Sequence, residues 1–317
     1  MSRYLVTGAY GAIGAWTLRA LLDRGHETVA LDVGEQAPRL AIALEPEQAE
    51  RVVRVRGDIT DLKLVERVLD EHAVTHVIHL AALQVPFVRA NPPLGAAVDV
   101  LGTVNVFEAV RRRRDRIAPV VYASSIAALG EGEHPSTLYG VFKWANEGTA
   151  ERYFEDYGVS SIGLRPHTVY GPGRDQGLTS APTTAMVAAA AGVRFHIPFG
   201  GSVQMQYTAD VGEAFVRASE LDYRGASVHN LDGPVVSMPE LIELIVREVP
   251  EATRLLTADR EPLPFPAEVD HASWLELVGE PVMRPVEAGV AEGLAQFRTL
   301  LADGRVRPPS TGGRAAG

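Results

Sequence analysis

The sequence predicts an α/β protein with a Rossmann-type, doubly wound parallel sheet and a smaller C-terminal substrate lobe. Short apolar segments alternate with amphipathic segments of helical length through the first half of the chain, which is the pattern of a right-handed parallel sheet. The first apolar segment, Tyr4–Val6, runs into a glycine-rich turn before a helix predicted over 12–24. The second, 27–31, closes on Asp32, about twenty residues after that turn begins, a spacing typical of dinucleotide-binding units.

The bulk composition limits the classes of function. The chain has 317 residues, 46% of them hydrophobic, enough for one large α/β domain or a domain with a smaller lobe. Its formal net charge of -10 argues against a nucleic-acid or anionic-membrane partner. The lack of cysteine excludes disulfides, thiol nucleophiles and thiolate metal sites. We find neither a signal peptide nor an apolar run of the ~20 residues that span a bilayer, and expect a cytoplasmic protein.

The turn between the first strand and the first helix is the expected pyrophosphate site. Glycines let backbone N–H groups and a helix N-terminus approach a phosphate without an intervening Cβ. A turn with no ligand also favours glycine, but the acid that ends the second strand supports a cofactor. The residues that we expect to contact the cofactor here are Gly8, Tyr10, Gly11, Ala12, Ile13 and Gly14.

Acidic residues that follow the second and third strands are expected to bind the adenosine half. The Asp32 carboxylate can accept hydrogen bonds from ribose hydroxyls and repels a 2′-phosphate, which favours NAD over NADP. A swing of Arg39 toward that phosphate is the alternative. Asp58, before Ile59, is placed to accept from the adenine amino group. Either Asp58 or Asp61 is also suited to cap the helix predicted over 62–71.

The remaining segments of the first half continue the alternation of strands and helices. We predict strands over 51–56, 75–80 and 119–123, and helices over 92–114 and 139–157. The small residues after the fourth strand, Leu80-Ala81-Ala82, leave room for a cofactor at the sheet edge. His76 and His79 point to opposite faces of that strand, so no metal site is expected.

The second half is expected to form the lobe. Four further helices are predicted, over 183–192, 210–221, 239–249 and 286–301. The glycine- and proline-rich stretch 171–182 is expected to be a loop over the site. The proline-rich residues 250–285 are expected to wrap the lobe.

Three residues are suited to acid–base chemistry on an alcohol or a carbonyl. Tyr139 and Lys143 are four residues apart on one helix, so both project from the same face. A phenol is a poor base at neutral pH, and a nearby ammonium stabilises the phenolate. Ser125 lies at the carboxyl end of the fifth strand and can hydrogen-bond the same substrate oxygen. We therefore predict Ser125, Tyr139 and Lys143 as catalytic residues.

Taken together, these motifs resemble the extended short-chain dehydrogenase/reductases, of the NAD-dependent epimerase/dehydratase type. The segments that carry the resemblance are Thr7–Gly14, Asp32, Gly57–Ile59, His79–Ala82, Tyr122–Ser125, Tyr139–Lys143 and Leu164–Gly173. The resemblance implies bound NAD and hydride transfer assisted by Tyr139, Lys143 and Ser125. It further implies that Lys143 holds the nicotinamide ribose and that Pro166 and Thr168 lie beside the cofactor. A homodimer joined through the helices at 92–114 and 139–157 is expected on the same ground.

Departures from the family pattern bear on the substrate. Members that act on nucleotide-diphosphate sugars usually carry Asn at Thr168 and Arg at Val203. The family as a whole usually carries Asn at Asp99, a departure that concerns the helix on the cofactor side. A valine cannot bind a diphosphate, so a contact of ~1.5–3 kcal/mol is missing unless another arginine replaces it. The candidates for that role are Arg174, Arg194 and Arg217.

If the family architecture holds, five residues face the substrate: Gln84, Ser125, Ala127, His167 and Thr168. His167 has two interpretations, as a group that orients a hydroxyl or carboxylate of the substrate or as a buried, hydrogen-bonded histidine.

These expectations define three functional hypotheses. The first is an NAD-dependent oxidoreductase acting on a secondary alcohol or ketone of a small sugar-like or hydroxy-acid substrate. The second is an NAD-retaining epimerase or dehydratase of a sugar, with or without a nucleotide. The third is a non-catalytic NAD-binding protein. We expect an NAD-binding Rossmann domain over 1–170, a substrate-binding lobe over 171–303 partly interleaved with it, and a flexible tail over 304–317.

Overall fold

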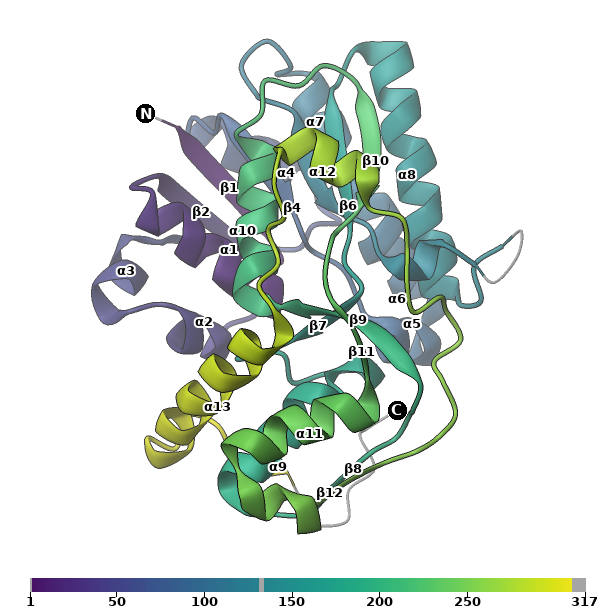
Figure 1. Cartoon of the computed structure of the whole chain (residues 1–317). Helices are drawn as coiled ribbons and strands as arrows, with labels where there is room; N and C mark the ends of the chain where they lie inside the picture. The colour runs from purple at the N-terminus through teal and green to yellow at the C-terminus, as the bar shows by residue number, and fades with distance from the viewer. Residues whose placement is uncertain (1, 131–133, 310–317) are drawn as a thin grey trace.

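The computed structural model describes residues 2–130 and 134–309, and its largest element is a parallel sheet of seven strands. The strand order is β10-β6-β5-β4-β1-β2-β3 (Figure 1). The strands are β1 (Arg3–Thr7), β2 (Glu27–Asp32), β3 (Val53–Arg56), β4 (His76–His79), β5 (Val120–Ala123), β6 (Ser161–Arg165) and β10 (Ala226–Asn230). The order reverses between β1 and β4, so a crevice opens at the carboxyl ends of these two strands. The predicted fold class is confirmed.

Helices cover both faces of this sheet because alternate residues of each strand point to opposite sides. Val6 and Ile78 pack with α1 (Ala12–Asp23) and α10 (Thr208–Ser219) on one face. Leu5 and Val77 pack with α4 (Leu62–Glu71) and α8 (Leu138–Tyr157) on the other. The bounds of α4 are those predicted. The third strand is shorter than predicted, because residues up to 51 complete a helix, α3 (Pro46–Arg51), that follows α2 (Pro38–Ala43).

The long helix predicted over 92–114 is present in altered form. It consists of α6 (Pro92–Gly95), a π-helical segment η1 (Ala96–Leu101) and α7 (Gly102–Arg111). The Arg113 guanidinium donates to the carbonyl of Ala109 at 2.9 Å, as expected for the last turn. It also pairs with Asp70 of α4, and this pairing lowers the pKa of the Asp70 carboxyl to about 2.

This helix also corrects an expectation about apolar runs. By length and hydropathy alone, Pro92–Arg111 passes the test for a membrane span, although the sequence analysis found no such run. Half of its apolar window is buried inside the fold. Phe107 and Val110 pack in the core cluster shared with the sheet, and therefore the hydropathy reflects a core helix.

The lobe has its own small sheets and its own core. Three strands, β11 (Val235–Ser237), β9 (Ser202–Tyr207) and β7 (Thr168–Tyr170), form one sheet, and β12 (Leu256–Ala258) pairs with β8 (Phe195–Ile197). These strands pack with α9 (Ala181–Ala191), α11 (Met238–Glu248) and α13 (Val286–Ala302) in a separate cluster, seen in the lower half of Figure 1. The helices predicted over 183–192, 239–249 and 286–301 are thus present in the lobe within a few residues of their expected ends. The helix predicted over 210–221 is present as α10, but it packs on the large sheet and not in the lobe.

The proline-rich stretch 250–285 contains more regular structure than expected. Besides β12 it forms α12 (Ala272–Val278), which packs on β10 of the large sheet. Trp274 of α12 is fully buried, and its indole N–H donates to Asp232 at 3.0 Å. Of the predicted tail, residues 310–317 lie outside the described residues. Before them, Arg305 donates to the carbonyl of Ala41 at 3.0 Å.

Candidate functional site

The glycine turn lies against the end of β4, and the contact requires glycine. Gly8 has a φ of +63°, and a Cβ on it would lie 2.7 Å from the backbone of Ala81. A Cβ on Gly14 would lie 2.5 Å from the carbonyl oxygen of Gly8. Gly11 is the N-cap of α1 and supplies no side-chain cap, and the first turn of α1 carries no acid. The helix N-terminus at Ala12 and Ile13 can therefore receive an anion.

Asp32 at the end of β2 is held by the backbone around it. Its two carboxylate oxygens accept from the N–H groups of Tyr10 and Gly34, each at 2.9 Å. Carboxylate oxygens have further lone pairs, so acceptors for ribose hydroxyls remain.

The guanidinium of Arg39, the alternative contact for a 2′-phosphate, already has protein partners. It donates to the carbonyls of Tyr10 at 3.3 Å and Gly173 at 3.1 Å, and to Asp175 at 2.6 Å. A swing toward a 2′-phosphate would break these bonds, which favours the NAD interpretation.

The two acids after β3 have different surroundings. Asp61 is the N-cap of α4 and accepts from the N–H of Leu64 at 3.1 Å, so the capping interpretation holds for this residue. The exposed Asp58 accepts from the N–H and the hydroxyl of Thr60 at 2.9 and 2.8 Å. The neighbouring Ile59 is buried. The role of Asp58 toward adenine stays a prediction.

The ends of β1 and β4 are joined by polar side chains that the sequence analysis did not identify. The Thr7 hydroxyl oxygen accepts from the N–H groups of Leu80 and Ala81, each at 3.2 Å. His79 is hydrogen-bonded to Thr7 at 2.7 Å and to Thr103 at 3.1 Å. Burial lowers the pKa of His79 to about 3, so the ring is neutral and fixes this edge of the sheet. Ala82 continues the same loop.

Tyr139 and Lys143 come together at the start of α8. The hydroxyl of Thr137 caps this helix through the N–H of Gly140 at 3.0 Å. The ammonium nitrogen of Lys143 lies 5.7 Å from the centre of the Tyr139 ring. It donates to the carbonyl of Ala123, the last residue of β5, at 2.8 Å. Lys143 is buried, so its charge acts in a medium of low dielectric.

Ser125 is brought to the same end of α8 by a short helix, η2 (Ile126–Ala128), which packs on α8. Its hydroxyl oxygen accepts from the N–H of Ala127 at 3.2 Å. The Ile126 N–H donates to the carbonyl of Pro166 at 3.1 Å, which ties η2 to the end of β6. The three predicted catalytic residues therefore share one end of β5 and α8.

A buried ion pair lies one turn further along α8. The Glu147 carboxylate accepts from Arg165 of β6 at 2.7 and 2.5 Å and from the hydroxyl of Ser124. Sequence reasoning missed this network. The spacing of four residues between Lys143 and Glu147 places both on one face of the helix, and it is a signal that could have found it.

Arg174 is the candidate arginine that the structure brings to the site. Its guanidinium donates to Gln84 at 3.3 Å and to Thr179 at 2.9 Å. Its Nε–H is buried and has no partner among residues 2–130 and 134–309. Burial lowers the pKa of Arg174, and Tyr139 is the first of the groups that oppose this shift. The contact between Thr179 and Arg174 was not predicted from the sequence.

The other two candidate arginines lie away from the site. Arg217 is ion-paired with Glu213 and Glu280 on the outside of α10. Arg194 is exposed before β8. The buried Val203 packs in the lobe core, so this position adds no contact to the site.

The segment that leads into β7 is buried, and its polar side chains form hydrogen bonds within the protein. The ring nitrogens of His167 are hydrogen-bonded to the hydroxyl of Thr168 at 3.2 Å and to the carbonyl of Pro266 at 2.9 Å. Burial lowers the pKa of His167. These contacts match the interpretation of a buried, hydrogen-bonded histidine. Thr168 is also fully buried.

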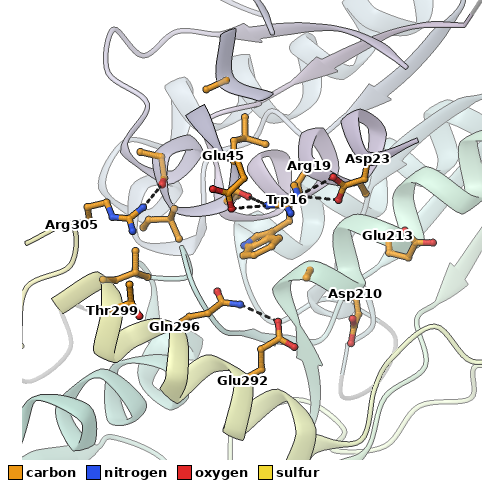
Figure 2. Close-up of a pocket in the computed structure, with 18 of the residues that line it drawn as sticks. Trp16, Arg19, Asp23, Glu45, Asp210, Glu213, Glu292, Gln296, Thr299 and Arg305 are labelled. Carbon is orange, nitrogen blue, oxygen red and sulfur yellow. Dashed lines mark hydrogen bonds and ion pairs between the residues drawn. The ribbon is translucent and has the colours of Figure 1, made fainter. Parts of the chain in front are cut away.

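A large cavity of about 830 Å³ lies elsewhere, between α1, α10, α13 and the segment around α2 and α3 (Figure 2). Its polar side chains already pair with one another, for example Arg19 with Asp23 and Gln296 with Glu292. None of Ser125, Tyr139 and Lys143 lines it. The cavity and the candidate site are therefore separate.

The fold and the site together define a Rossmann-type, dinucleotide-binding protein with a tyrosine–lysine pair on one helix. The model of the NAD dependent epimerase/dehydratase family matches residues 4–231. The chain belongs to this family, and the resemblance stated from its motifs is confirmed.

Individual relatives differ in what their names say they do. UDP-glucuronate 4-epimerase 1 of Arabidopsis thaliana is 35% identical over 183 residues, which are 53% of this chain and 42% of that protein. This chain thus spans less than half of that relative's length. The structure of MoeE5 in complex with UDP-glucose and NAD is similar at 26% identity and a TM-score of 0.75, covering 95% of this chain and all of that one. L-threonine dehydrogenase from Clostridium difficile has a TM-score of 0.81 at 21% identity, covering 94% and 98%, and this likeness concerns the fold.

Proposed function

We propose that this chain is an NAD-dependent oxidoreductase acting on a secondary alcohol or ketone of a small sugar-like or hydroxy-acid substrate that carries an anionic group. The observation that carries the proposal is the pairing of Tyr139 with the buried Lys143. A second cation, Arg174, is held by Gln84 and Thr179. The family match supports the cofactor, and MoeE5 is a relative seen with NAD.

The residues around the crevice fit a dinucleotide. Gly8, Gly11, Gly14 and the start of α1 would receive the pyrophosphate, because the glycines let the turn fold tightly against the end of β4 and the helix N-terminus has no side-chain cap. The fixed Asp32 carboxylate would accept from ribose hydroxyls. When bound, NAD supplies a hydride acceptor. Further contacts are proposed for Tyr10, Asp58, Ile59, Leu80, Ala81, Ala82, Lys143, Pro166 and Thr168.

In this proposal Tyr139 is the general acid and base. Its phenolate oxygen takes the proton of the substrate hydroxyl in oxidation, and its phenol returns it in reduction. The buried Lys143 ammonium stabilises the phenolate at close range. The Ser125 hydroxyl hydrogen-bonds the same oxygen while charge develops on it. The geometry thus provides a proton acceptor, its stabilising charge and an orienting donor.

Arg174 supplies the argument for an anionic group on the substrate. The guanidinium of Arg174 is half-buried, and its buried Nε–H is costly to leave unmatched unless an anion completes its bonding. Carboxylates bind guanidinium groups through two parallel hydrogen bonds. The name of the Arabidopsis relative includes glucuronate, which carries a carboxylate. We therefore favour a hydroxy acid or a uronic-acid-type sugar.

The second candidate function is an epimerase that retains NAD and returns the hydride. The curated relatives favour it, because the first of them is a 4-epimerase. The chain covers less than half of that protein, and Val203 lies in the lobe core where it cannot bind a diphosphate. Whether the substrate carries a nucleotide is therefore decided by comparing substrates with and without one in the experiment below.

The test is a product analysis with purified protein, NAD and UDP-glucuronate, UDP-glucose, free glucuronate or L-threonine. Net oxidation produces NADH in proportion to substrate consumed, which its near-ultraviolet absorbance reports. Epimerisation converts the substrate to its stereoisomer with no net change in that absorbance. Failure to bind NAD in calorimetry would contradict both candidates and leave the non-catalytic hypothesis without its ligand.

A homodimer is part of the proposal. The helix that spans Pro92–Arg111 exposes Leu94 and Leu101, and α8 exposes Leu138, Val141 and Trp144. These are the two helices expected to join protomers. The two helices pack against each other, and large apolar side chains exposed on neighbouring helices are suited to an interaction surface. The proposal keeps the cytoplasmic location and the small-molecule substrate expected from the sequence.

A further inference from the structure

Asp99 is a buried acid whose presence the proposed reaction does not explain. It lies in the π-helical segment η1 and is fully buried. One carboxylate oxygen accepts from the N–H of Leu83 at 2.7 Å. The other is buried and has no hydrogen-bond partner among the described residues. Such an oxygen is costly to bury, so a compensating positive charge is expected nearby.

Lys143 lies on α8 one turn before Asn146, which contacts Asp99. The residues hydrogen-bonded to Asp99 come from the loop after β4, from α7 and from α8. From α8, Asn146 donates to the Asp99 carbonyl at 2.8 Å, and the Lys143 ammonium acts on the carboxylate. From β4, His79 reaches this region through Thr103, which donates to the same carbonyl at 2.7 Å. His79 is neutral because burial lowers its pKa to about 3.

The Lys143 ammonium itself needs an anion. It is buried, and the hydrogen-bond acceptor that the structure gives it is a neutral carbonyl, that of Ala123. A buried ammonium without a counter-charge is strongly disfavoured. Burial raises the pKa of the Asp99 carboxyl, while Lys143 and the Leu83 N–H oppose that shift. The two groups therefore stabilise each other's charged form.

We propose that Asp99 is the counter-charge of the Lys143 ammonium and a positioning residue that sets how readily Tyr139 ionises. This inference rests on the roles given to Tyr139 and Lys143 in the proposed function. The ammonium favours the phenolate of Tyr139, and a negative charge at Asp99 offsets part of that field. Removing the Asp99 charge makes the potential at Tyr139 more positive and the phenolate more stable.

The substitution Asp99→Asn removes the negative charge of the side chain and keeps its size and shape. The amide keeps an oxygen that can accept from the Leu83 N–H, so the loop between β4 and the helix keeps its tie. Asp70→Asn is the matched control, because it removes the same charge from an exposed carboxylate at the far end of α4.

The experiment is a tyrosinate absorbance titration with NAD bound, which needs no substrate. Subtracting the curve of a Tyr139→Phe protein isolates the signal of Tyr139, and the same subtraction is made in each background. In Asp99→Asn, we expect the midpoint about 0.5–1 pH unit lower than in the wild type. In Asp70→Asn, we expect it unchanged.

An unchanged or higher midpoint in folded Asp99→Asn would overturn the proposal. Circular dichroism establishes that the variant is folded. If it is not, Asp99→Ser, which is smaller and still offers an acceptor to Leu83, takes its place with the same expected direction. The readout is independent of turnover, so a protein inactive on every substrate tried would contradict the proposed function without deciding the role of Asp99.

Discussion

At the scale of single residues, two side chains lead to testable predictions, Tyr139 and Arg174. Tyr139 lies within 5.7 Å, centre of ring to nitrogen, of the Lys143 ammonium. Arg174 is held by Gln84 and Thr179 and keeps one unmatched N–H. Each side chain has a distinct expected effect when changed, because we propose that Tyr139 moves a proton and that Arg174 binds the substrate.

Replacing the hydroxyl of Tyr139 tests the proton-transfer role. We expect Tyr139→Phe to lower kcat by about 10²–10⁴-fold, the usual contribution of a positioned acid–base group. The affinity for NAD should change by less than about threefold, because a ring of the same shape remains. Steady-state kinetics and calorimetry measure the two quantities. Turnover close to that of the wild type would mean that another group moves the proton.

Replacing the guanidinium of Arg174 tests the anionic substrate. We expect Arg174→Lys to raise KM about tenfold or more with a smaller effect on kcat, because an ammonium cannot form two parallel bonds to a carboxylate. Arg217→Lys, on the outside of α10, serves as the control. An unchanged KM for UDP-glucuronate or free glucuronate in Arg174→Lys would remove this residue from the substrate site.

At the scale of elements, the contacts between helices were harder to foresee than the helices themselves. The periodicity of residues 62–71 and 139–157 predicted α4 and α8 almost to the residue. The pairing of Glu147 with Arg165 joins α8 to β6 and depends on which strand lies beneath the helix. Similarly, the π-helical segment that holds Asp99 packs against α8, and helical periodicity alone does not predict such a segment.

The backbones of α1 and α10 approach each other closely, and this contact gives a prediction for stability. A Cβ on Gly212 would lie 2.6 Å from the backbone of Trp16, so the helices must separate to accept it. We expect Gly212→Ala to lower the free energy of unfolding by about 1–3 kcal/mol. Gly148→Ala in α8, where a Cβ meets nothing within 4 Å, is the control and should not destabilise. Denaturant unfolding compares them, and equal stability would contradict the close contact.

At the scale of the whole molecule, three hydrophobic cores build the fold. Two lie on the opposite faces of the large sheet, one with α1 and α10 and one with α4 and α8, and the third fills the lobe. Trp16 of α1 donates to the carbonyl of Pro172, and Arg39 bonds to Gly173 and Asp175. The loop that carries Arg174 is therefore anchored to the glycine-turn side of the site.

The apolar faces of α8 and of the helix 92–111 lead to a prediction for assembly. Trp144 is 49% exposed and Leu101 is 47% exposed, large fractions for side chains of this kind. We expect Trp144→Asp to convert a homodimer to monomer, because a charge cannot be buried there unpaired. Sedimentation velocity measures the mass of each form. A wild-type protein that sediments as a monomer at micromolar concentration would contradict the proposed dimer.

The sequence by itself determined the fold class, the glycine turn with Asp32, and the Tyr139–Lys143 pair. These features are local, since they depend on periodicity and on spacings along one strand or one helix. Only the tertiary structure showed that Arg174 is held by Gln84 and Thr179 while Arg217 pairs with Glu213 and Glu280. The same holds for the partners of both His167 ring nitrogens and for the Asp99 oxygen that has no partner among residues 2–130 and 134–309. Each of these depends on contacts between segments distant in the chain, and the order of residues alone does not specify which segments meet.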